Sequence, residues 1–420
     1  TGFAHGRAQK QKVKMGGNCN GEITHYSLEV IQDSGAYPKW GAILPGSTLM
    51  MASGVYQIPN VEFSSRSVAT TTAPVCAYRG AGRPEATSVI ERTVDLFARK
   101  IDMDPAKVRR LNFPDRKEFP FRNSTGTVYD SGDYEGALDK ALNAIDYEEI
   151  RSEQNRRRDA NERLQLGIGI STYVEVTAGG GGGEYGLVEL KNDGTFLATT
   201  GSTPIGTGHV TTWAMLVADR LGVPMEKVEI VYGDTDKVPS GEMTGGSRSV
   251  QVSGSSMADA SEKLVESARK AAADLLEASE DDIVLNKESG AFHVVGTPTV
   301  SVSWDELASS PSVDQKQLVG TSDFSQEGAT FPFGAHIVIA EVDIETGAVK
   351  IKRVIAVDDA GTIVNPLLAT GQVHGGLAQG VAQALLEEIS YDSEGNPQTS
   401  NLMDYTAISA MELPSFERIV

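Results

Sequence analysis

Apolar positions recur at helical spacing in several long stretches of the chain, and shorter runs between them alternate between apolar and polar residues. Residues 23–30 partly alternate, and we expect residues 20–70 to form mainly strands. Pro84 lies at the first turn of the next predicted helix, which the apolar residues between Val89 and Phe97 extend. The same spacing predicts further helices over residues 105–111, 134–158, 208–221, 249–276 and 366–386.

Two turn signals predict β-hairpins. Asn192-Asp193-Gly194 and Glu345-Thr346-Gly347 each lie between two runs of strand-forming residues. These turns join residues 184–191 to 195–200 and residues 335–342 to 349–357. The polar, turn-rich segment 112–132 predicts a domain boundary.

The composition is that of an ordinary globular protein large enough for more than one domain. The chain has 420 residues, and its 37 Lys and Arg against 57 Asp and Glu give a net charge of −20. This acidity argues against a nucleic acid or an anionic membrane as partner. No run approaches the roughly 20 apolar residues of a membrane span. Cys19 and Cys76 are too few for a four-thiolate iron–sulfur or zinc site, and they fit a cytoplasmic protein.

Four segments combine glycine or small residues with polar side chains, and we expect each of them directly before a helix. They are residues 77–84, 204–209, 243–249 and 365–376. Free N–H groups and the positive end of the helix dipole attract anions there, and glycine lets the backbone approach a ligand closely. Each segment alone is also typical of a plain helix cap. Together they predict a site for one anionic ligand.

The common phosphate-binding and catalytic motifs do not explain these segments. The chain has no GxxxxGK[ST] loop, no GxSxG elbow and no HExxH pair. Gly206-Thr207-Gly208 lacks the third glycine of a dinucleotide-binding GxGxxG, because Thr211 stands in its place. A phosphorylated cofactor held by several separate turns therefore fits better than a nucleotide held by one motif. A nucleotide-dependent transferase that uses residues 206–209 is a weaker alternative.

In combination, these residues resemble the molybdenum-cofactor-binding large subunit of the xanthine dehydrogenase, aldehyde oxidase and aerobic carbon monoxide dehydrogenase family. The motifs that carry the resemblance are AYRGAGRPEA at 77–86, GDTD at 233–236, TGGSRS at 244–249, and Asn365-Pro366 with GQVHGG at 371–376. The resemblance covers nearly the whole chain. It implies an α+β fold of two elongated mixed α/β molybdopterin-binding domains. Residues 1–130 then form the C-terminal part of the first domain, and residues 131–420 form the second, incomplete at its C-terminus.

The resemblance also implies roles for individual residues. It assigns Arg79, Gly80 and Ala81 to the surroundings of molybdenum, Gly206 and Thr207 to the pterin or its phosphate, Gly246, Ser247 and Ser249 to the pyrophosphate, and Gln372 to a hydrogen bond with the pterin. Thr207 replaces the family's usual glutamine, so a side-chain amide contact is lost. No residue of the chain is expected to bind the metal, which the pterin dithiolene holds. For Glu175 we expect a structural role.

The implied activity is oxidation of an aldehyde or an aromatic N-heterocycle with oxygen derived from water. Copper-dependent carbon monoxide dehydrogenases carry Cys where this chain has Gly80, which disfavours oxidation of carbon monoxide. A carbon monoxide dehydrogenase-like subunit and a non-catalytic ligand-binding scaffold stay open as alternatives. The family's catalytic Glu is expected beyond Val420 and its glycine–phenylalanine-rich loop before Thr1, so we expect the 420-residue chain alone to be inactive.

The resemblance further implies the other components of the enzyme. The cofactor is expected to be the cytosine dinucleotide form of molybdopterin with molybdenum. Electrons from the small-molecule substrate are expected to pass to an iron–sulfur small subunit and an FAD medium subunit. The expected assembly is a cytoplasmic dimer of heterotrimers without a membrane span.

Overall fold

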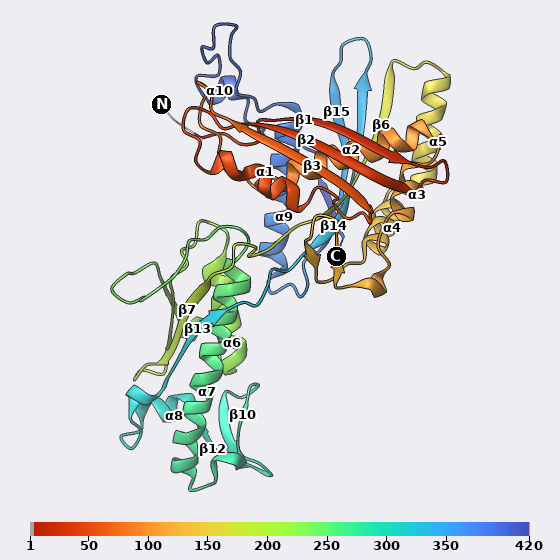
Figure 1. The fold of residues 1–420 in the computed structure, drawn as a ribbon. Coiled ribbons are helices and arrows are strands. Elements are labelled where there is room, and N and C mark those ends of the chain that lie inside the picture. The colour runs from red at the N-terminus through yellow and green to blue at the C-terminus, as the bar shows by residue number, and fades with distance from the viewer. Residues whose placement is uncertain (1–3, 420) are drawn as a thin grey trace. The chain divides into compact units, whose positions relative to one another are not determined.

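The computed structural model describes residues 4–419, which fold into two compact units (Figure 1). Unit 1 consists of residues 4–175, 331–361 and 370–419, and unit 2 consists of residues 176–330 and 362–369. Each unit combines helices with a sheet that contains both antiparallel and parallel strand pairs. This arrangement confirms the predicted α+β class. The domain boundary between residues 130 and 131 stays a prediction.

The first sheet of unit 1 has the order β1-β2-β3 and is seen at the red end of the colour scale in Figure 1. Its strands are β1 (Gln9–Gly17), β2 (Ile23–Asp33) and β3 (Asn60–Val68). The parallel pairing of β2 with β3 requires a crossover, and helix α1 (Trp40–Met50) lies in this connection. The prediction of strands throughout residues 20–70 was therefore wrong in its middle part. The apolar residues of α1 show no helical period, and Pro45 lies inside it, so the sequence signal for a helix was weak.

The helices of unit 1 follow the predicted positions more closely. Pro84 lies in the first turn of α2 (Arg83–Lys100), and Pro105 is the first residue of α3 (Pro105–Leu111). The Asp104 carboxylate caps α3 by accepting from the N–H of Ala106 and Lys107. The single helix predicted over 134–158 is in fact α4 (Tyr134–Ala144) and α5 (Tyr147–Asp159). The helices separate at Asp146, whose φ of 51° is left-handed.

The second sheet of unit 1 joins segments that are far apart in the sequence. Its order is β16-β15-β14-β6, with β6 (Leu164–Val174), β14 (Phe333–Asp343), β15 (Val349–Asp359) and β16 (Phe416–Ile419). The hairpin of β14 and β15 confirms the prediction from Glu345-Thr346-Gly347. Helix α4 packs against β14 and β15. Smaller elements of the unit are η1 (Arg116–Glu118), β4 (Phe121–Arg122), β5 (Val128–Tyr129) and α10 (Leu402–Tyr405).

A buried ion pair connects α2 and α3 to β6. The Arg109 side chain of α3 is fully buried, and its Nη2 lies 2.9 Å from Oε2 of Glu91 on α2. The same Nη2 donates to the carbonyl of Ile170 on β6 at 2.9 Å. Glu91 also accepts from the Thr172 N–H at 2.8 Å and from the Tyr56 hydroxyl. Burial holds the pKa of Tyr56 well above its usual value, so this hydroxyl stays protonated and donates.

Unit 2 is built on a sheet of order β13-β7-β8-β9. The strands are β7 (Gly183–Leu190), β8 (Phe196–Thr200), β9 (Val228–Tyr232) and β13 (Val319–Ser325). Helix α6 (His209–Leu221) ends at left-handed Gly222, as predicted, and η2 (Met225–Lys227) follows. The predicted helix 249–276 begins as a π-helical turn, η3 (Ser249–Ser253), and continues as α7 (Gly254–Leu276).

The core of unit 2 lies between its sheet and α7. Phe196, Trp213, Leu264 and Trp304 are all buried in this core. A second, smaller sheet and a short helix close it; the elements are η4 (Glu280–Asp282), β10 (Ile283–Asn286), β11 (Ala291–Val294), β12 (Thr297–Ser303), α8 (Trp304–Ser309) and η5 (Gln315–Gln317). The last long helix of the chain is α9 (Pro366–Leu385).

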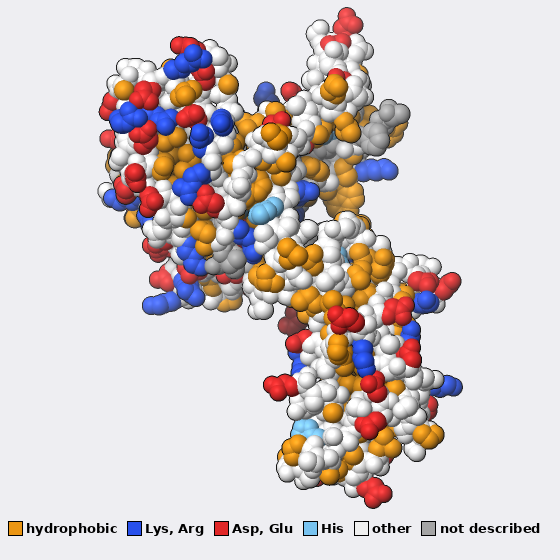
Figure 2. All heavy atoms as spheres, turned by 180° about the vertical axis from the view of Figure 1, so that it is seen from behind, with side chains coloured by type: hydrophobic (Ala, Val, Ile, Leu, Met, Phe, Trp, Pro, Cys, Tyr) orange, Lys and Arg blue, Asp and Glu red, His pale blue; other side chains and the backbone are white. Residues whose placement is uncertain are grey.

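The surface carries both signs of charge. On the face seen in Figure 2, Lys and Arg side chains are interspersed with Asp and Glu side chains. Among residues 4–419, no helix is both long enough and apolar enough to cross a bilayer.

Removing Arg109 tests the importance of the buried ion pair. Arg109→Met leaves the Glu91 carboxylate buried without its cation, and we expect a loss of about 3–5 kcal/mol in the free energy of unfolding, measured by urea titration. Arg110→Met is the matched control, because the neighbouring Arg110 pairs with Asp139 at the surface; its loss is expected to be about 0–1 kcal/mol. Equal losses for the two variants would show that the buried pair contributes no more to the free energy of unfolding than the surface pair.

Candidate functional site

A glycine turn precedes α6 in unit 2. Gly206 and Gly208 have φ values of 90° and 79°, and Thr207 lies between them. A Cβ on Gly206 would meet nothing within 4 Å, so the backbone here faces open space. Within residues 4–419, the N–H groups of residues 206–208 donate no hydrogen bond. This turn therefore offers free donors at a helix start.

A second glycine turn precedes η3 and α7. Gly246 and Ser247 have φ values of 63° and 58°, and a Cβ on Gly246 would also meet nothing within 4 Å. The Gly246 carbonyl accepts from the Ala178 N–H at 2.8 Å. In the part of the chain that the structure describes, the N–H groups of Gly245, Gly246 and Ser247 have no acceptor. We call residues 206–208 and 245–247 the unit-2 turns.

Trp213 on α6 brings the unit-2 turns together. Its indole Nε1 donates at 2.9 Å to the carbonyl of Ser249, which lies two residues beyond the second turn. Its ring stacks on His209 with 5.3 Å between centroids, and His209 Nδ1 lies 2.9 Å from Oγ1 of Thr207 in the first turn. Burial lowers the pKa of His209, which favours the neutral ring at physiological pH. Thr207, predicted to have lost an amide contact, thus uses its hydroxyl on His209.

One further predicted residue near the second turn, Ser249, is buried. Ser249 donates from its Oγ to Oγ1 of Thr244 at 2.9 Å. Its hydroxyl proton is therefore used internally, which leaves the oxygen available only as an acceptor in this arrangement. An interaction of Ser249 with a phosphate would require this hydroxyl to rotate.

Arg248 directly follows the second turn, and its side chain is directed into the protein. Its Nη1 donates to Oε2 of Glu184 at 2.9 Å, and its Nη2 donates to the Gly183 carbonyl at 2.9 Å. The Glu184 carboxylate also accepts from the Ser202 hydroxyl at 2.9 Å. Both members of the ion pair are buried. The charge of Arg248 is thus matched inside unit 2, and the turn itself presents backbone N–H groups.

The turn before α2 in unit 1 has an unusual backbone. Gly80, Ala81 and Gly82 have φ values of 96°, 42° and 87°, and the Ala81 N–H donates to the Tyr78 carbonyl at 2.7 Å. A Cβ on Gly80 would lie 2.4 Å from Cγ of Pro84. Both the left-handed φ and this close contact require glycine at position 80. We call residues 78–82 the unit-1 turn.

The unit-1 turn contacts the helix that carries Gln372. Arg79 Nη1 donates to the Gly375 carbonyl on α9 at 2.6 Å, one helical turn beyond Gln372. The prediction of a turn at 365–376 was wrong for Gly371–Gly376, because these residues lie inside α9. Asn365 is the residue at the start of the helix, where its Oδ1 accepts from the Leu368 N–H at 3.0 Å. The backbone N–H of Gln372 is therefore inside a helix, whereas its side chain is exposed.

Arg83, at the start of α2, forms an ion pair instead of facing a ligand. Its Nη2 lies 2.8 Å from Oε1 of Glu175, and both side chains are largely buried. The expectation of a structural role for Glu175 is consistent with this pair.

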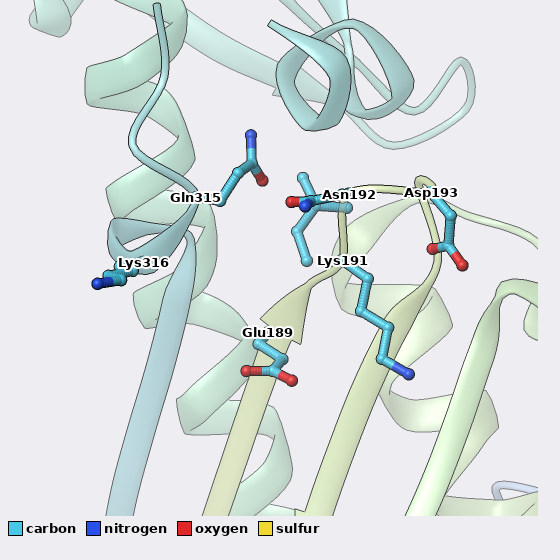
Figure 3. Close-up of a pocket in the computed structure, with 7 residues that line it drawn as sticks. Glu189, Lys191, Asn192, Asp193, Gln315 and Lys316 are labelled. Atoms are coloured by element: carbon cyan, nitrogen blue, oxygen red, sulfur yellow. The ribbon is translucent and has the colours of Figure 1, made fainter. Parts of the chain in front are cut away.

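A shallow pocket in unit 2 is lined by none of the predicted site residues. It is formed at the β7–β8 turn and η5, and Figure 3 shows side chains of both signs around it. Lys191 Nζ lies 3.0 Å from Oε2 of Glu229, so its charge is paired. The lining residues are Glu189, Leu190, Lys191, Asn192, Asp193, Gln315 and Lys316. Across residues 4–419, no three His, Cys, Asp or Glu side chains cluster in a way that could hold a metal ion.

Comparison with protein families gives two matches that together span most of the chain. The model described as molybdopterin cofactor-binding domain matches residues 140–414, and a second model with the same description matches residues 2–113.

Individual relatives resemble the chain over its whole length. It is 36% identical to the carbon monoxide dehydrogenase large chain of Hydrogenophaga pseudoflava, over 99% of this chain and 54% of that protein. The chain thus spans about half the length of this relative. Among solved structures, a Cu,Mo-CO dehydrogenase matches with a TM-score of 0.91 and 30% identity over 99% of this chain and 55% of that one. Quinoline 2-oxidoreductase from Pseudomonas putida 86 matches with a TM-score of 0.91 and 29% identity over 100% of this chain and 55% of that one.

Two alanine variants test the contrast between the glycine turns. Gly206→Ala places a Cβ in open space at a left-handed φ, and we expect it to lower the free energy of unfolding by about 1–2 kcal/mol. Gly80→Ala adds the clash with Pro84, so we expect it to lower the free energy of unfolding by clearly more than Gly206→Ala does. Urea unfolding of both variants and the parent chain measures the difference. If both variants lose the same stability, position 80 does not have the close contact described.

Proposed function

Because the chain belongs to the molybdopterin cofactor-binding family, we propose that it binds a molybdenum cofactor within the large subunit of a molybdenum hydroxylase. The observation that carries this proposal is the pair of unit-2 turns. Their N–H groups lack acceptors among the described residues, and Trp213 links the helix that follows the first turn to Ser249, two residues beyond the second. Such donors at helix starts suit the phosphate groups of a cofactor.

The residues present fit a phosphorylated pterin. The directions in which Gly206 and Gly246 would carry a Cβ are open, so phosphate oxygens can approach the backbone. We assign Gly206, Thr207, Gly246, Ser247 and Ser249 to the pterin phosphate, in the cytosine dinucleotide form of the cofactor. Because Glu184 neutralises Arg248, the N–H dipoles of the turns provide most of the attraction for the anion.

The residues of unit 1 are assigned to the metal end of the cofactor. Arg79, Gly80 and Ala81 form the unit-1 turn, and Gln372 lies on α9, which Arg79 contacts. Their part is to orient the cofactor and the substrate. When bound, the molybdenum cofactor supplies the two-electron oxidation of a carbon centre with oxygen from water.

We propose an aldehyde or an aromatic N-heterocycle as substrate. The support is Gly80, since its φ of 96° and its contact with Pro84 exclude a cysteine in this backbone. A copper-bridging thiolate is therefore not available at position 80. Oxidation of carbon monoxide is the second candidate, favoured by the 36% identity to a carbon monoxide dehydrogenase large chain.

The proposed enzyme needs partner subunits for electron transfer. Cys19 and Cys76 are the only cysteines, and neither is in a disulfide. Iron–sulfur clusters and FAD are therefore assigned to a small and a medium subunit, in a cytoplasmic dimer of heterotrimers.

Metal and phosphorus analysis of the purified complex that contains this chain tests the proposal. We expect molybdenum and phosphorus in constant ratio, and release of a cytosine nucleotide on mild acid treatment. A folded complex without either element would favour a non-catalytic binding scaffold instead.

A substrate screen then separates the two candidate activities. Aldehydes, N-heterocycles and carbon monoxide are supplied with an artificial electron acceptor. Reduction of the acceptor with an aldehyde or a heterocycle supports the hydroxylase. Reduction with carbon monoxide alone would overturn that choice of substrate.

A further inference from the structure

Arg7 reaches the unit-1 turn from a segment about seventy residues earlier in the chain. Its Nη2 donates to the Arg79 carbonyl at 2.7 Å, and its Nη1 donates to the Tyr78 carbonyl at 3.3 Å. The guanidinium carbon also lies 5.3 Å from the centroid of the Tyr78 ring. One side chain thus contacts two consecutive peptide groups of the turn.

Glu85 completes this arrangement on the other side of the turn. Its Oε2 lies 3.3 Å from Nη1 of Arg7 and accepts from the Gly82 N–H at 2.9 Å. The side chains of Arg7 and Glu85 are only 14% and 6% exposed, so water competes little for these bonds. The ion pair therefore holds the turn at Tyr78, Arg79 and Gly82.

Arg7 is itself fixed from a third direction. Its Nε donates to Oε1 of Gln383 on α9 at 3.1 Å. Gln379, one helical turn earlier, donates to the same Oε1 at 3.1 Å. The guanidinium therefore has a defined orientation before any ligand binds.

The contact with the Arg79 carbonyl determines the orientation of the next peptide N–H. In a planar trans peptide, the carbonyl oxygen and the following N–H point in opposite directions. Because the Arg79 carbonyl points toward the Arg7 guanidinium that donates to it, the Gly80 N–H points away from Arg7. Within residues 4–419, this N–H has no acceptor.

We propose that Arg7 is a positioning residue that fixes the 79–80 peptide so that the Gly80 N–H is available as a hydrogen-bond donor to the bound cofactor. This inference rests on the proposed function. In this role Arg7 acts on the turn and not on the ligand, because four of its five N–H donors are used on Tyr78, Arg79, Glu85 and Gln383.

Variants of Arg7 in the intact complex test the proposal. Arg7→Lys keeps the charge near Glu85 but cannot contact two carbonyls and Gln383 in one planar fork. We expect it to retain molybdenum, to lower kcat by about 10- to 100-fold with little change in KM, and to alter the electron paramagnetic resonance spectrum of Mo(V). Arg66→Lys is the control, because Arg66 is exposed on β3 of the same unit. A wild-type spectrum and kcat in Arg7→Lys would overturn the proposal.

A second measurement does not depend on the loaded enzyme. In the cofactor-free complex, hydrogen–deuterium exchange of a peptide covering residues 78–82 should be faster in Arg7→Met than in Arg66→Met. Unchanged exchange would show that Arg7 does not hold the turn. If the parent complex contains no molybdenum, the proposed function fails, and faster exchange in Arg7→Met would still show that Arg7 fixes the turn.

Discussion

The contact between Arg109 and Glu91 determines how the first half of unit 1 is assembled. A fully buried guanidinium is stable only if its donors are satisfied, and here the acceptors come from α2 and β6 as well as from α3 itself. The direction of α2 relative to β6 is thereby fixed. The unit-1 turn leads directly into α2. The contact between Arg109 and Glu91 therefore also helps to fix the position of this turn, whose residues are assigned to the metal end of the cofactor. A polar interaction in the core thus supports a candidate binding site at the surface.

Three arginines beside the glycine turns of the two units share one arrangement. Arg7, Arg83 and Arg248 each lie beside or within a glycine turn, and each is paired with a glutamate. Their guanidinium groups bond mainly to the protein, so they organise backbone and leave peptide N–H groups to face a ligand. Under the proposed function, this is how a chain with a net charge of −20 would attract an anion. Peptide dipoles attract a phosphate without adding a mobile cation to the surface.

Local sequence signals predicted the elements with strong caps and turns. Asp104 before Pro105, Gly222 after α6, and Glu345-Thr346-Gly347 between β14 and β15 each act on neighbouring residues, and their elements were confirmed. Helix α1 was missed because its apolar residues show no helical period. The glycine turns were recognised from composition, but their role in binding stays a prediction.

The contacts that organise the turns could not be predicted from local sequence patterns. Trp213 donates to Ser249, and Arg7 donates to Arg79, across long separations in the chain that only the folded structure closes. The burial of Arg248 could not be predicted either. Its place in the polar segment TGGSRS suggests a surface cation, whereas the ion pair with Glu184 holds it in the interior. A residue's position in a motif does not reveal which way its side chain points.

The contact between Gly80 and Pro84 has a consequence for how enzymes of this kind diverge. A change of position 80 to cysteine by itself would produce an intermediate with a distorted loop, because the proline ring already occupies the space. Acquisition of a thiolate there would require a compensating change at position 84, either earlier or at the same time. The two positions are therefore expected to change together, because a cysteine at position 80 needs more space than the Pro84 ring leaves in this chain.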